Sequence, residues 1–394
     1  MKLLPLIWWH AWRHRGRSVL LVLCVAVAVL VPMLSRSLAA RFESGLRARA
    51  EMAPLVVGAR GGRFDLVLAA LYFRRAPIDT ITHARFEALA REPTALAVPI
   101  HARFTAGGSP VVATDITYFQ RPGVALPLAE GRLFALLGEA VVGAAAAERQ
   151  GLEPGGTILS DVREAYDIAE ASPVRLAVVG VLEPTGTADD DAIFVDLETA
   201  WLLEGFSHGH DDAAAIDRED LIIARQGERV ALSEALRTYQ EVTEDNADSF
   251  HVHGSKDNFP LTAVLLYPRD QRAATILEAR MNAESGQGTG VQAIEPAAVV
   301  DELIAFVIRL RLVFDAISVV LAASTGALIA LIATLGYRLR ADELRTLADM
   351  GASRRTGLVL VGGEVLGLIV LGAALALGMA SGVLAIATRA SAFL

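Results

Sequence analysis

The chain has 394 residues, of which 53% are hydrophobic, and a positive mean hydropathy of +0.43. It is too apolar for an ordinary soluble protein and too polar to lie wholly within a membrane, so we expect a few membrane spans and one or two soluble domains. The single cysteine, Cys24, excludes an intrachain disulfide and a cysteine-rich metal site.

The net charge of −9 is distributed unevenly along the chain. Residues 1–40 contain five Lys or Arg and no acid, and residues 304–394 contain eight Arg and five acids. The middle block, residues 41–303, contains 23 bases and 40 acids. Basic ends around an acidic block fit the positive-inside rule, with the acidic block outside the cytoplasm. The acidic charge also argues against nucleic acid as a partner.

The N-terminal region predicts a membrane anchor. Residues 1–17 mix Trp and Leu with His and Arg, which is typical of an amphipathic helix in the cytoplasmic interface. The apolar run that follows predicts a first transmembrane helix over 18–38. A cleaved signal peptide is the alternative, because residues 37–39 resemble a cleavage site, but the apolar run exceeds the usual length. A four-residue apolar stripe beyond the run predicts a stalk continuing the helix: Leu34, Leu38, Phe42 and Leu46.

Residues 39–303 contain no second run long enough to span a bilayer and predict an extracytoplasmic α+β domain with stalk helices. Short apolar runs predict strands at 54–58, 64–71, 96–100, 110–114, 175–182, 192–197, 220–224 and 262–267. Other segments predict helices at 83–91, 139–149, 232–241 and 275–282, and loops at 205–217 and 242–260. The expected fold is therefore three transmembrane α-helices with a large α+β domain inserted between the first and second.

The C-terminal region predicts two further spans. An amphipathic helix over 297–311 leads into a second transmembrane helix, assigned to 304–336, and the third covers 358–386. With the N-terminus in the cytoplasm, the tail 387–394 would be extracytoplasmic. Glu364 lies about two turns inside the third span. It is interpreted either as a carboxylate satisfied at the interface or within the bundle, or as an interhelical contact that moves during transport.

The segment 337–357, YRLRADELRTLADMGASRRTG, connects these two spans and contains five arginines. Leu344, Leu347 and Met350 recur at three-residue spacing on one side of a predicted helix. Gly351 is placed to end that helix in a left-handed conformation, and Ser353 to cap the next one. The pattern fits a cytoplasmic hairpin, or a docking helix for a partner that exerts force on the membrane.

Two H-x-H motifs are the only candidate metal ligands: His208 with His210, and His251 with His253. Alternate residues of an extended strand share one face, so each motif could present two imidazoles to one metal ion such as zinc. Histidines of a surface loop are the alternative interpretation. The acidic run 189–191 is expected to be a solvated turn.

Catalytic motifs are missing from the sequence. It contains no G-x-x-x-x-G-K-[ST], so the chain cannot be its own P-loop ATPase. It also contains no G-x-S-x-G and no H-E-x-x-H, which removes support for hydrolase functions. We therefore expect a protein that is not an enzyme and binds no cofactor directly.

The sequence resembles the MacB/FtsX-like ABC transporter permeases over nearly its whole length. The resemblance rests on the Trp- and Arg-rich start, the large domain between the first two spans, and several segments: IWWHAWRHRGRSVLLVL, LVVGARGGRFDLVLAALY, GEAVVGAAAAERQGL, VVGVLEPTGTADDDAIFVDLE and RADELRTLADMGASRRTGLVLVGGEVLG. The last segment has the family's acidic-basic helix, Gly-Ala-Ser-Arg-Arg turn and glutamate in the following span.

The resemblance implies a dimeric permease, formed with itself or a second permease, that recruits a separate cytoplasmic ABC ATPase. ATP bound by that ATPase would move the cytoplasmic segment, and the spans and stalks would pass the movement to the outer domain. Carried over to this chain, the coupling residues are Glu343, Leu344, Leu347, Gly351, Ser353 and Arg354, with Glu364 as a contact between transmembrane helices. The expected location is the bacterial inner membrane, with a lipoprotein, lipid, peptide or hydrophobic cargo and an envelope partner.

One departure from the family is expected to matter. The family has four spans, whereas three are predicted here, so the fourth is absent, supplied by another chain or truncated. Two alternative functions follow from the residues: a metal-related transport component that uses the H-x-H motifs, and a non-transporting signalling or scaffold protein that regulates a cell-envelope enzyme.

Overall fold

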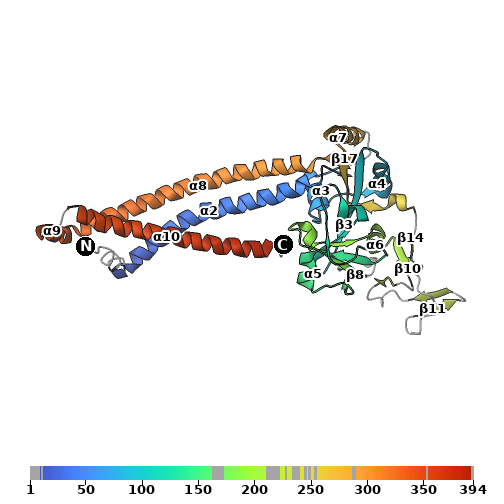
Figure 1. The fold of residues 1–394 in the computed structure, drawn as a ribbon, viewed down its shortest axis with the longest axis horizontal. Helices are drawn as coiled ribbons and strands as arrows, with labels where there is room; N and C mark the ends of the chain where they lie inside the picture. The colour runs from blue at the N-terminus through green and yellow to red at the C-terminus, as the bar shows by residue number, and fades with distance from the viewer. Residues whose placement is uncertain are drawn as a thin grey trace. The chain divides into compact units, whose positions relative to one another are not determined.

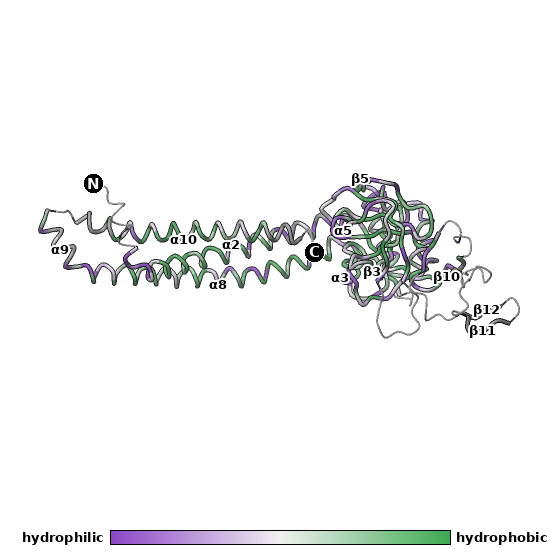
Figure 2. The backbone as a smooth tube through the Cα atoms, turned by 90° about the horizontal axis from the view of Figure 1, so that it is seen from below, coloured by the Kyte–Doolittle hydropathy of each residue, from purple (hydrophilic) through white to green (hydrophobic). Residues whose placement is uncertain are grey.

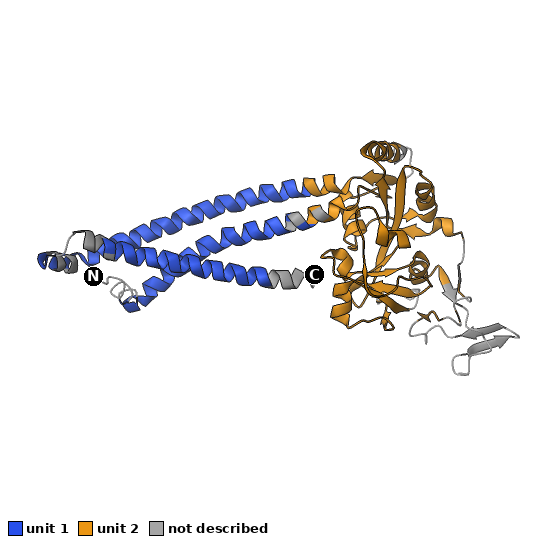
Figure 3. Ribbon diagram, viewed as in Figure 1, with its two compact units in different colours: residues 1–45, 303–391 blue, residues 46–302, 392–394 orange. Residues whose placement is uncertain are grey.

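The chain forms two compact units, described here from a computed structural model (Figures 1 and 3). One contains residues 1–45 and 303–391, and the other contains residues 46–302. The structure describes residues 9, 12–161, 173–209, 222–226, 229–232, 240–243, 246, 250–252, 255–285, 290–351 and 354–391. We call the first the helical unit and the second the sheet unit.

The helical unit is built from long helices, which are α2 (Arg15–Glu51), α8 (Pro296–Leu339) and α10 (Arg354–Ser391), with the short α9 (Ala341–Asp349) between the last two. Three stretches are long and apolar enough to cross a membrane: Arg15–Glu51, Pro296–Leu339 and Val361–Ala385. Figure 2 shows hydrophobic residues along most of α8 and α10. Only 6% of the most apolar window of α8 is buried within the protein, so most of its apolar side chains are at least partly exposed, although Ile329 and Ile332 pack against the core between α2 and α10.

Both predicted helical extensions are present. α2 continues without a break through the expected stalk to Glu51, although Pro32 lies inside it. The predicted amphipathic helix 297–311 and the second span form the single helix α8. Because α8 extends to Leu339 and α10 begins at Arg354, the segment 337–357 is not one element but two helix ends with α9 between them.

A small apolar core joins α2 to α10. Leu21, Val22 and Val25 of α2 are buried together with Leu368 of α10. The helices approach closely at Gly372, where an added Cβ would lie 2.8 Å from Val25 Cβ and 2.9 Å from the Val22 carbonyl oxygen. Glycine is therefore required here for packing, as in other helix pairs whose backbones approach closely.

The sheet unit contains, among its described residues, an eleven-stranded mixed sheet in the order β13-β8-β6-β9-β4-β3-β16-β1-β17, with β5 and β7 also paired to β8. Its strands are β1 (Leu55–Ala59), β3 (Ala95–Ala106), β4 (Ser109–Ala113), β5 (Leu128–Gly131), β6 (Glu139–Val142), β7 (Thr157–Leu159), β8 (Val174–Leu182), β9 (Ile193–Val195), β13 (Gln240–Glu241), β16 (Ala263–Pro268) and β17 (Val291–Ile294). Three two-stranded sheets pair β2 (Ile81–Thr82) with β15 (Pro260–Leu261), β10 (Ser207–Gly209) with β14 (Phe250–Val252), and β11 (Ile222–Gln226) with β12 (Arg229–Leu232).

The helices of this unit are α3 (Arg63–Leu71), α4 (His83–Ala90), α5 (Ala144–Gln150), α6 (Leu197–Leu203) and α7 (Gln271–Ser285), with 3-10 turns η1 (Ile116–Gln120), η2 (Ala188–Asp191) and η6 (Lys256–Asn258). Two apolar cores are present. One lies around β4, β6, β8 and β9, and the other around β1, β16 and β17. The mixture of helices and a mixed sheet is compatible with the predicted α+β class of this domain.

Most predicted strands are present, and the exceptions have identifiable causes. Residues 64–71 form α3 instead of a strand, because a short run that is apolar throughout fits a buried helix as well as a strand. Residues 139–149, predicted as one helix, form β6 and then α5, with a break at Gly143. A Cβ at Gly143 would lie 2.1 Å from the Asp189 carbonyl oxygen, so this turn packs tightly against η2.

Three further predictions were partly wrong or fall outside the described residues. Residues 233–239 of the predicted helix 232–241 lie outside them, and its last two residues belong to strand β13. The predicted loop 205–217 contains strand β10. The predicted loop 242–260 contains β14, η6 and the start of β15. Short strands with few apolar residues give little periodic signal, so sequence patterns do not detect them.

The contact at Gly372 gives a matched pair of substitutions. Gly372→Ala should force α2 and α10 apart and lower stability by about 1–3 kcal/mol, the usual range for overpacking. Gly378→Ala, where nothing lies within 4 Å of the added Cβ, should be neutral or slightly stabilising. Thermal denaturation of the full chain in detergent checks both. Equal midpoints for the two variants would show that the helices do not approach at Gly372.

Candidate functional site

The candidate coupling helix α9 lies between a turn at Arg340 and a turn at Met350–Gly351. Arg340 separates it from α8, and the Arg340 amide donates to the Tyr337 carbonyl at 3.2 Å. At the other end, the Met350 amide donates to the Thr346 carbonyl, and Gly351 has a φ of +97°. Gly351 thus takes the left-handed conformation predicted from the sequence, which a residue with a side chain rarely adopts.

The helical spacing divides α9 into two sides. Glu343, Leu344 and Leu347 fall on one side of a 3.6-residue helix, and Asp342 and Arg345 fall on the other. The Arg345 guanidinium donates to the Asp342 carboxylate at 3.2 Å, and both side chains are largely exposed. Ion pairs of this kind contribute little to stability, so this side is a solvated face.

Of the other predicted coupling residues, the structure describes Arg354 but not Ser353. Arg354 is the first residue of α10, and Ser353 lies outside the described residues, as does its proposed role as a helix cap. Gly351 and Arg354 are therefore the described residues on either side of positions 352–353. The described part of the sequence motif covers the end of α9 and the start of α10.

Glu364 is buried in the helical unit and bonded to two arginines. Its side chain is only 5% exposed, and its Oε2 atom accepts a hydrogen bond from Arg340 Nη1 at 3.0 Å. Its Oε1 atom accepts a second bond from Arg17 Nη2. The Arg340 side chain is also buried, at 9% exposed, whereas that of Arg17 is 30% exposed. We call these three residues the Glu364 cluster.

The Glu364 cluster connects three parts of the chain. Arg17 belongs to the first turn of α2, Arg340 is the residue between α8 and α9, and Glu364 belongs to α10. Gly336 of α8 lies beside the cluster, where an added Cβ would make an ordinary contact of 3.4 Å with Arg17 Nη1. A buried carboxylate without such partners is strongly unfavourable, so the three chain segments are held together by this charge.

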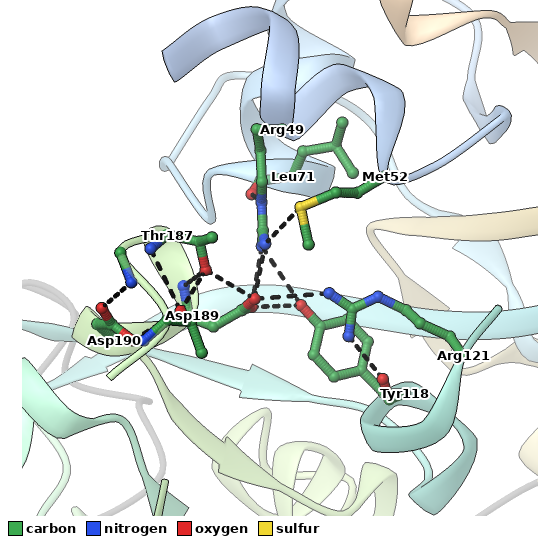
Figure 4. A network of polar contacts seen from close by, with 10 residues as sticks. Arg49, Met52, Leu71, Tyr118, Arg121, Thr187, Asp189 and Asp190 are labelled. Carbon is green, nitrogen blue, oxygen red and sulfur yellow. Dashed lines mark hydrogen bonds and ion pairs between the residues drawn. The ribbon is translucent and has the colours of Figure 1, made fainter. Parts of the chain in front are cut away.

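A second buried carboxylate lies in the sheet unit (Figure 4). Asp189 has no exposed surface, so the expectation of a fully solvated acidic turn was wrong at this residue. Arg49, near the end of α2, donates to it in a bidentate pair, from Nη1 at 2.6 Å and from Nη2 at 2.9 Å. The Tyr118 hydroxyl donates to the same carboxylate at 2.5 Å.

Further contacts complete this network, which we call the Asp189 cluster. The Thr187 hydroxyl donates to Asp189 at 3.0 Å, and Arg121 Nη2 lies 3.5 Å from it. The Arg121 guanidinium stacks over the Tyr118 ring, 3.9 Å from its centroid. Arg49 Nε also donates to the Leu71 carbonyl at 2.8 Å, so α2, the end of α3, η1 and η2 all meet at one charge.

The charges of the Asp189 cluster hold one another in their ionised forms. Burial alone raises the pKa of Asp189, but the neighbouring Arg49 and Arg121 charges and the hydrogen bonds outweigh burial and place the pKa below its usual range. Burial opposes the charge of Arg49, and Asp189 more than offsets it, so the pKa of Arg49 is raised. Burial, and then Asp189, raise the pKa of Tyr118, which stays a neutral donor.

The three neighbouring aspartates have different roles that the sequence does not distinguish. Asp190 accepts from the amides of Thr185 and Gly186 at 2.8 and 2.7 Å and closes the turn. Asp191 pairs with Arg149 at 2.8 Å, where both side chains are partly exposed. Only Asp189 is turned into the protein, because η2 packs against the backbone at Gly143.

The H-x-H motifs are placed in part. Strands β10 and β14 pair antiparallel in a register that sets His208 opposite His251. His210 and His253 lie outside the described residues. Among the residues whose side chains are described, no group of three or more His, Cys, Asp or Glu could hold a metal ion.

No family model matches this chain, and no curated protein matches it.

The Glu364 cluster predicts a large cost for one substitution. Glu364→Ala leaves the buried Arg340 without its carboxylate and should lower the free energy of unfolding by about 3–5 kcal/mol. Asp315→Ala removes the exposed pair with Arg36 in the same unit, with side chains 31% and 59% exposed, and should cost about 0–1 kcal/mol. Thermal denaturation of the full chain in detergent compares them. An unchanged midpoint for Glu364→Ala would contradict the described burial.

The Asp189 cluster predicts a similar contrast. Asp189→Asn removes the charge that compensates Arg49 and should cost about 3–5 kcal/mol, whereas Asp191→Asn breaks a partly exposed pair and should cost about 0–1 kcal/mol. The pKa of Asp189 is lower in the folded protein than in the unfolded chain, where it is about 3.9. The stability that the Asp189 charge contributes is therefore fully present above the unfolded-state pKa, and it is lost as the pH falls towards the lower pKa of the folded protein.

The pH dependence supplies a second measurement of the same cluster. The difference in stability between the wild type and Asp189→Asn should be constant between about pH 7 and pH 5 and should shrink below about pH 4. Denaturation midpoints at each pH measure this difference. A difference that instead grew on acidification would show that the Asp189 pKa is raised rather than lowered in the folded protein.

Proposed function

We propose that this chain is the membrane-spanning subunit of an ABC transporter that transmits force instead of conducting its cargo. A separate cytoplasmic ATPase binds α9, and its ATP-driven closure displaces that helix. The displacement passes through the helical unit to the sheet unit, which acts on a lipoprotein, lipid, peptide or other hydrophobic cargo. The chain itself hydrolyses no ATP.

The Glu364 cluster is the observation that carries this proposal. Arg340 is the residue directly before α9, and its guanidinium is bonded to the same carboxylate as Arg17 of α2. A displacement of α9 therefore strains bonds to both α2 and α10, rather than being absorbed by a free loop. This arrangement suits a coupling helix better than a simple hairpin between spans.

The continuity of α2 supports the second half of the path. Arg17 and Arg49 belong to one uninterrupted helix, and each is bonded to a buried carboxylate. A helix transmits axial movement because its backbone hydrogen bonds resist stretching, although Pro32 removes one of these bonds from α2. The movement of the Arg17 end would therefore reach the Asp189 cluster, whose bonds extend to η1 and η2.

The membrane placement belongs to the same proposal. The three long apolar helices span the bacterial inner membrane, which would cover the apolar side chains of α8 that the protein leaves at least partly exposed. The arginine-rich start of the chain and the segment around α9 face the cytoplasm, and the acidic sheet unit lies outside it. A second permease subunit, identical or different, covers part of the remaining apolar helix surface.

The two sides of α9 provide the test. In membranes that contain the co-purifying ATPase, Glu343→Arg or Leu347→Asp should reduce stimulated ATP hydrolysis at least about tenfold, since each places an unfavourable charge on the proposed contact side. Arg345→Ala, on the solvated side, should leave hydrolysis within about twofold of the wild type.

Assembly and coupling need separate readouts. The amount of ATPase that co-purifies reports binding, and the hydrolysis rate per complex reports coupling. If no ATPase co-purifies with the wild-type chain, or if the Glu343 and Leu347 variants hydrolyse ATP as the wild type does, α9 is not the coupling helix. A non-transporting scaffold function would then account better for the chain.

A further inference from the structure

His83 is a largely buried histidine of the sheet unit that the proposed function does not use. It is the first residue of α4, and its side chain is 13% exposed. Its Nδ1 atom is buried and has no hydrogen-bond partner among the described residues. The Glu87 carboxylate, one turn further along α4, lies 3.9 Å from this atom, which is too far for a hydrogen bond. A buried ring nitrogen without a partner is uncommon in a folded protein and calls for an explanation.

The His83 ring packs against helix α6. It meets the Trp201 ring edge-to-face, with centroids 5.1 Å apart and an interplanar angle of 90°. Trp201 is 2% exposed, and its Nε1 atom also lacks a hydrogen-bond partner within the part of the chain that the structure describes. No hydrogen bond from His83 Nδ1 or from Trp201 Nε1 therefore fixes this contact, and it depends on the packing of the two rings.

The contact joins helices that belong to different apolar cores of the sheet unit. Leu89 of α4 is buried in the core around β1, β16 and β17, whereas Leu202 of α6 is buried in the core around β4, β6, β8 and β9. The His83 amide donates to the Phe259 carbonyl at 2.8 Å, and the Phe259 ring packs edge-to-face against Trp201. His83 thus lies at a point where elements of both cores are held together.

The surroundings of His83 favour its neutral form. Burial lowers the pKa of His83 from its ordinary value of 6.5, and it outweighs the charges that act on the ring. Glu87 of α4 raises the pKa, Lys256 of η6 lowers it, and Asp257 of η6 raises it. Lys256 is itself paired with Glu198 of α6. A positive charge is also unfavourable at the first turn of a helix. The ring contact is therefore fully stable above about pH 6.5 and weakens as the pH falls through the lower pKa of the folded protein.

We propose that His83 is a pH-sensitive joint between α4 and α6. In its neutral form, the ring packs against Trp201. When it takes up a proton from the solvent, the ring leaves its buried position towards water and the Glu87 carboxylate, which is 43% exposed. The packing of α4 on α6 then loosens at this point, and Trp201 loses a neighbouring ring. This inference does not depend on the transport function proposed above.

The fluorescence of Trp201 in the full chain in detergent tests the proposal. Replacing the other tryptophans, Trp8, Trp9 and Trp12, by Phe leaves Trp201 as the only one of the four. Its emission maximum should move reversibly to longer wavelength on acidification, because its surroundings become more polar, with a midpoint below about pH 6.5. His83→Gln in the same background cannot take up the proton and should show no such shift. His14→Gln, the same change in the helical unit, should keep it.

Two charge variants keep the proposal testable if His83→Gln does not fold. Glu87→Gln removes a charge that favours the protonated ring and should move the midpoint to lower pH. Lys256→Gln removes a charge that opposes it and should move the midpoint to higher pH. These side chains are 43% and 50% exposed, so the fold should tolerate both changes. A purely structural role of His83 would not produce shifts of opposite sign.

Three results would overturn the proposal. One is an emission maximum that stays constant between about pH 7.5 and about pH 5 with His83 present. Another is a shift that His83→Gln leaves unchanged, which would assign it to a different group, such as His101 of β3. The third is a midpoint above about pH 6.5, because the protonated ring would then be stabilised in place by cation–π attraction to Trp201 instead of released. Circular dichroism at each pH establishes that the chain remains folded.

Discussion

A carboxylate buried beside apolar helices can exist only with compensating positive charge, and Glu364 satisfies this requirement with Arg17 and Arg340. The requirement gives the helical unit its specificity. Leucine and valine faces allow many rotations and offsets between helices, whereas a charge with two fixed partners allows few. The position of α10 against the start of α2 and against the junction before α9 therefore follows from one side chain, supported by the close approach at Gly372.

The same chemistry recurs in the sheet unit, where Asp189 takes the place of Glu364. Each carboxylate has two arginine partners, and in each case one of the arginines belongs to α2: Arg17 near its beginning and Arg49 near its end. α2 is consequently bonded at both ends to charges that cannot be left unpaired. Under the proposed function, these two attachments are the points at which α2 would receive and pass on a displacement.

The sequence predicted the long helices, the α+β class and the left-handed Gly351, because these depend on local hydropathy, alternation and backbone chemistry. It could not predict that Asp189 is buried while Asp190 and Asp191 serve a turn and a surface pair, because burial depends on the distant Gly143, Arg49 and Tyr118. Residues 64–71 were assigned to a strand for a related reason. A short, uniformly apolar segment carries no period from which helix and strand can be told apart.

Glu364 was recognisable as unusual from its place in an apolar run, but its partners were not. Arg340 was one of five arginines in its segment, and Arg17 lies 347 positions away. The pairing of His208 with His251 similarly required the strand register, although the H-x-H pattern had singled out both residues. Local patterns thus nominate residues with unusual chemistry, and the tertiary structure decides which of them meet.

The most direct test of the proposed force transmission follows the far end of α2 while the proposed ATPase partner hydrolyses ATP. Amide hydrogen exchange around Arg49 and Asp189 should be measured in the complex with its ATPase, with ATP trapped and without nucleotide. If α2 transmits force, exchange at these segments should change with nucleotide in the wild type, and this change should be lost in a Glu364→Gln complex that still binds the ATPase. The same nucleotide-dependent change in both complexes would contradict the account, because movement would then reach the sheet unit without the Glu364 cluster.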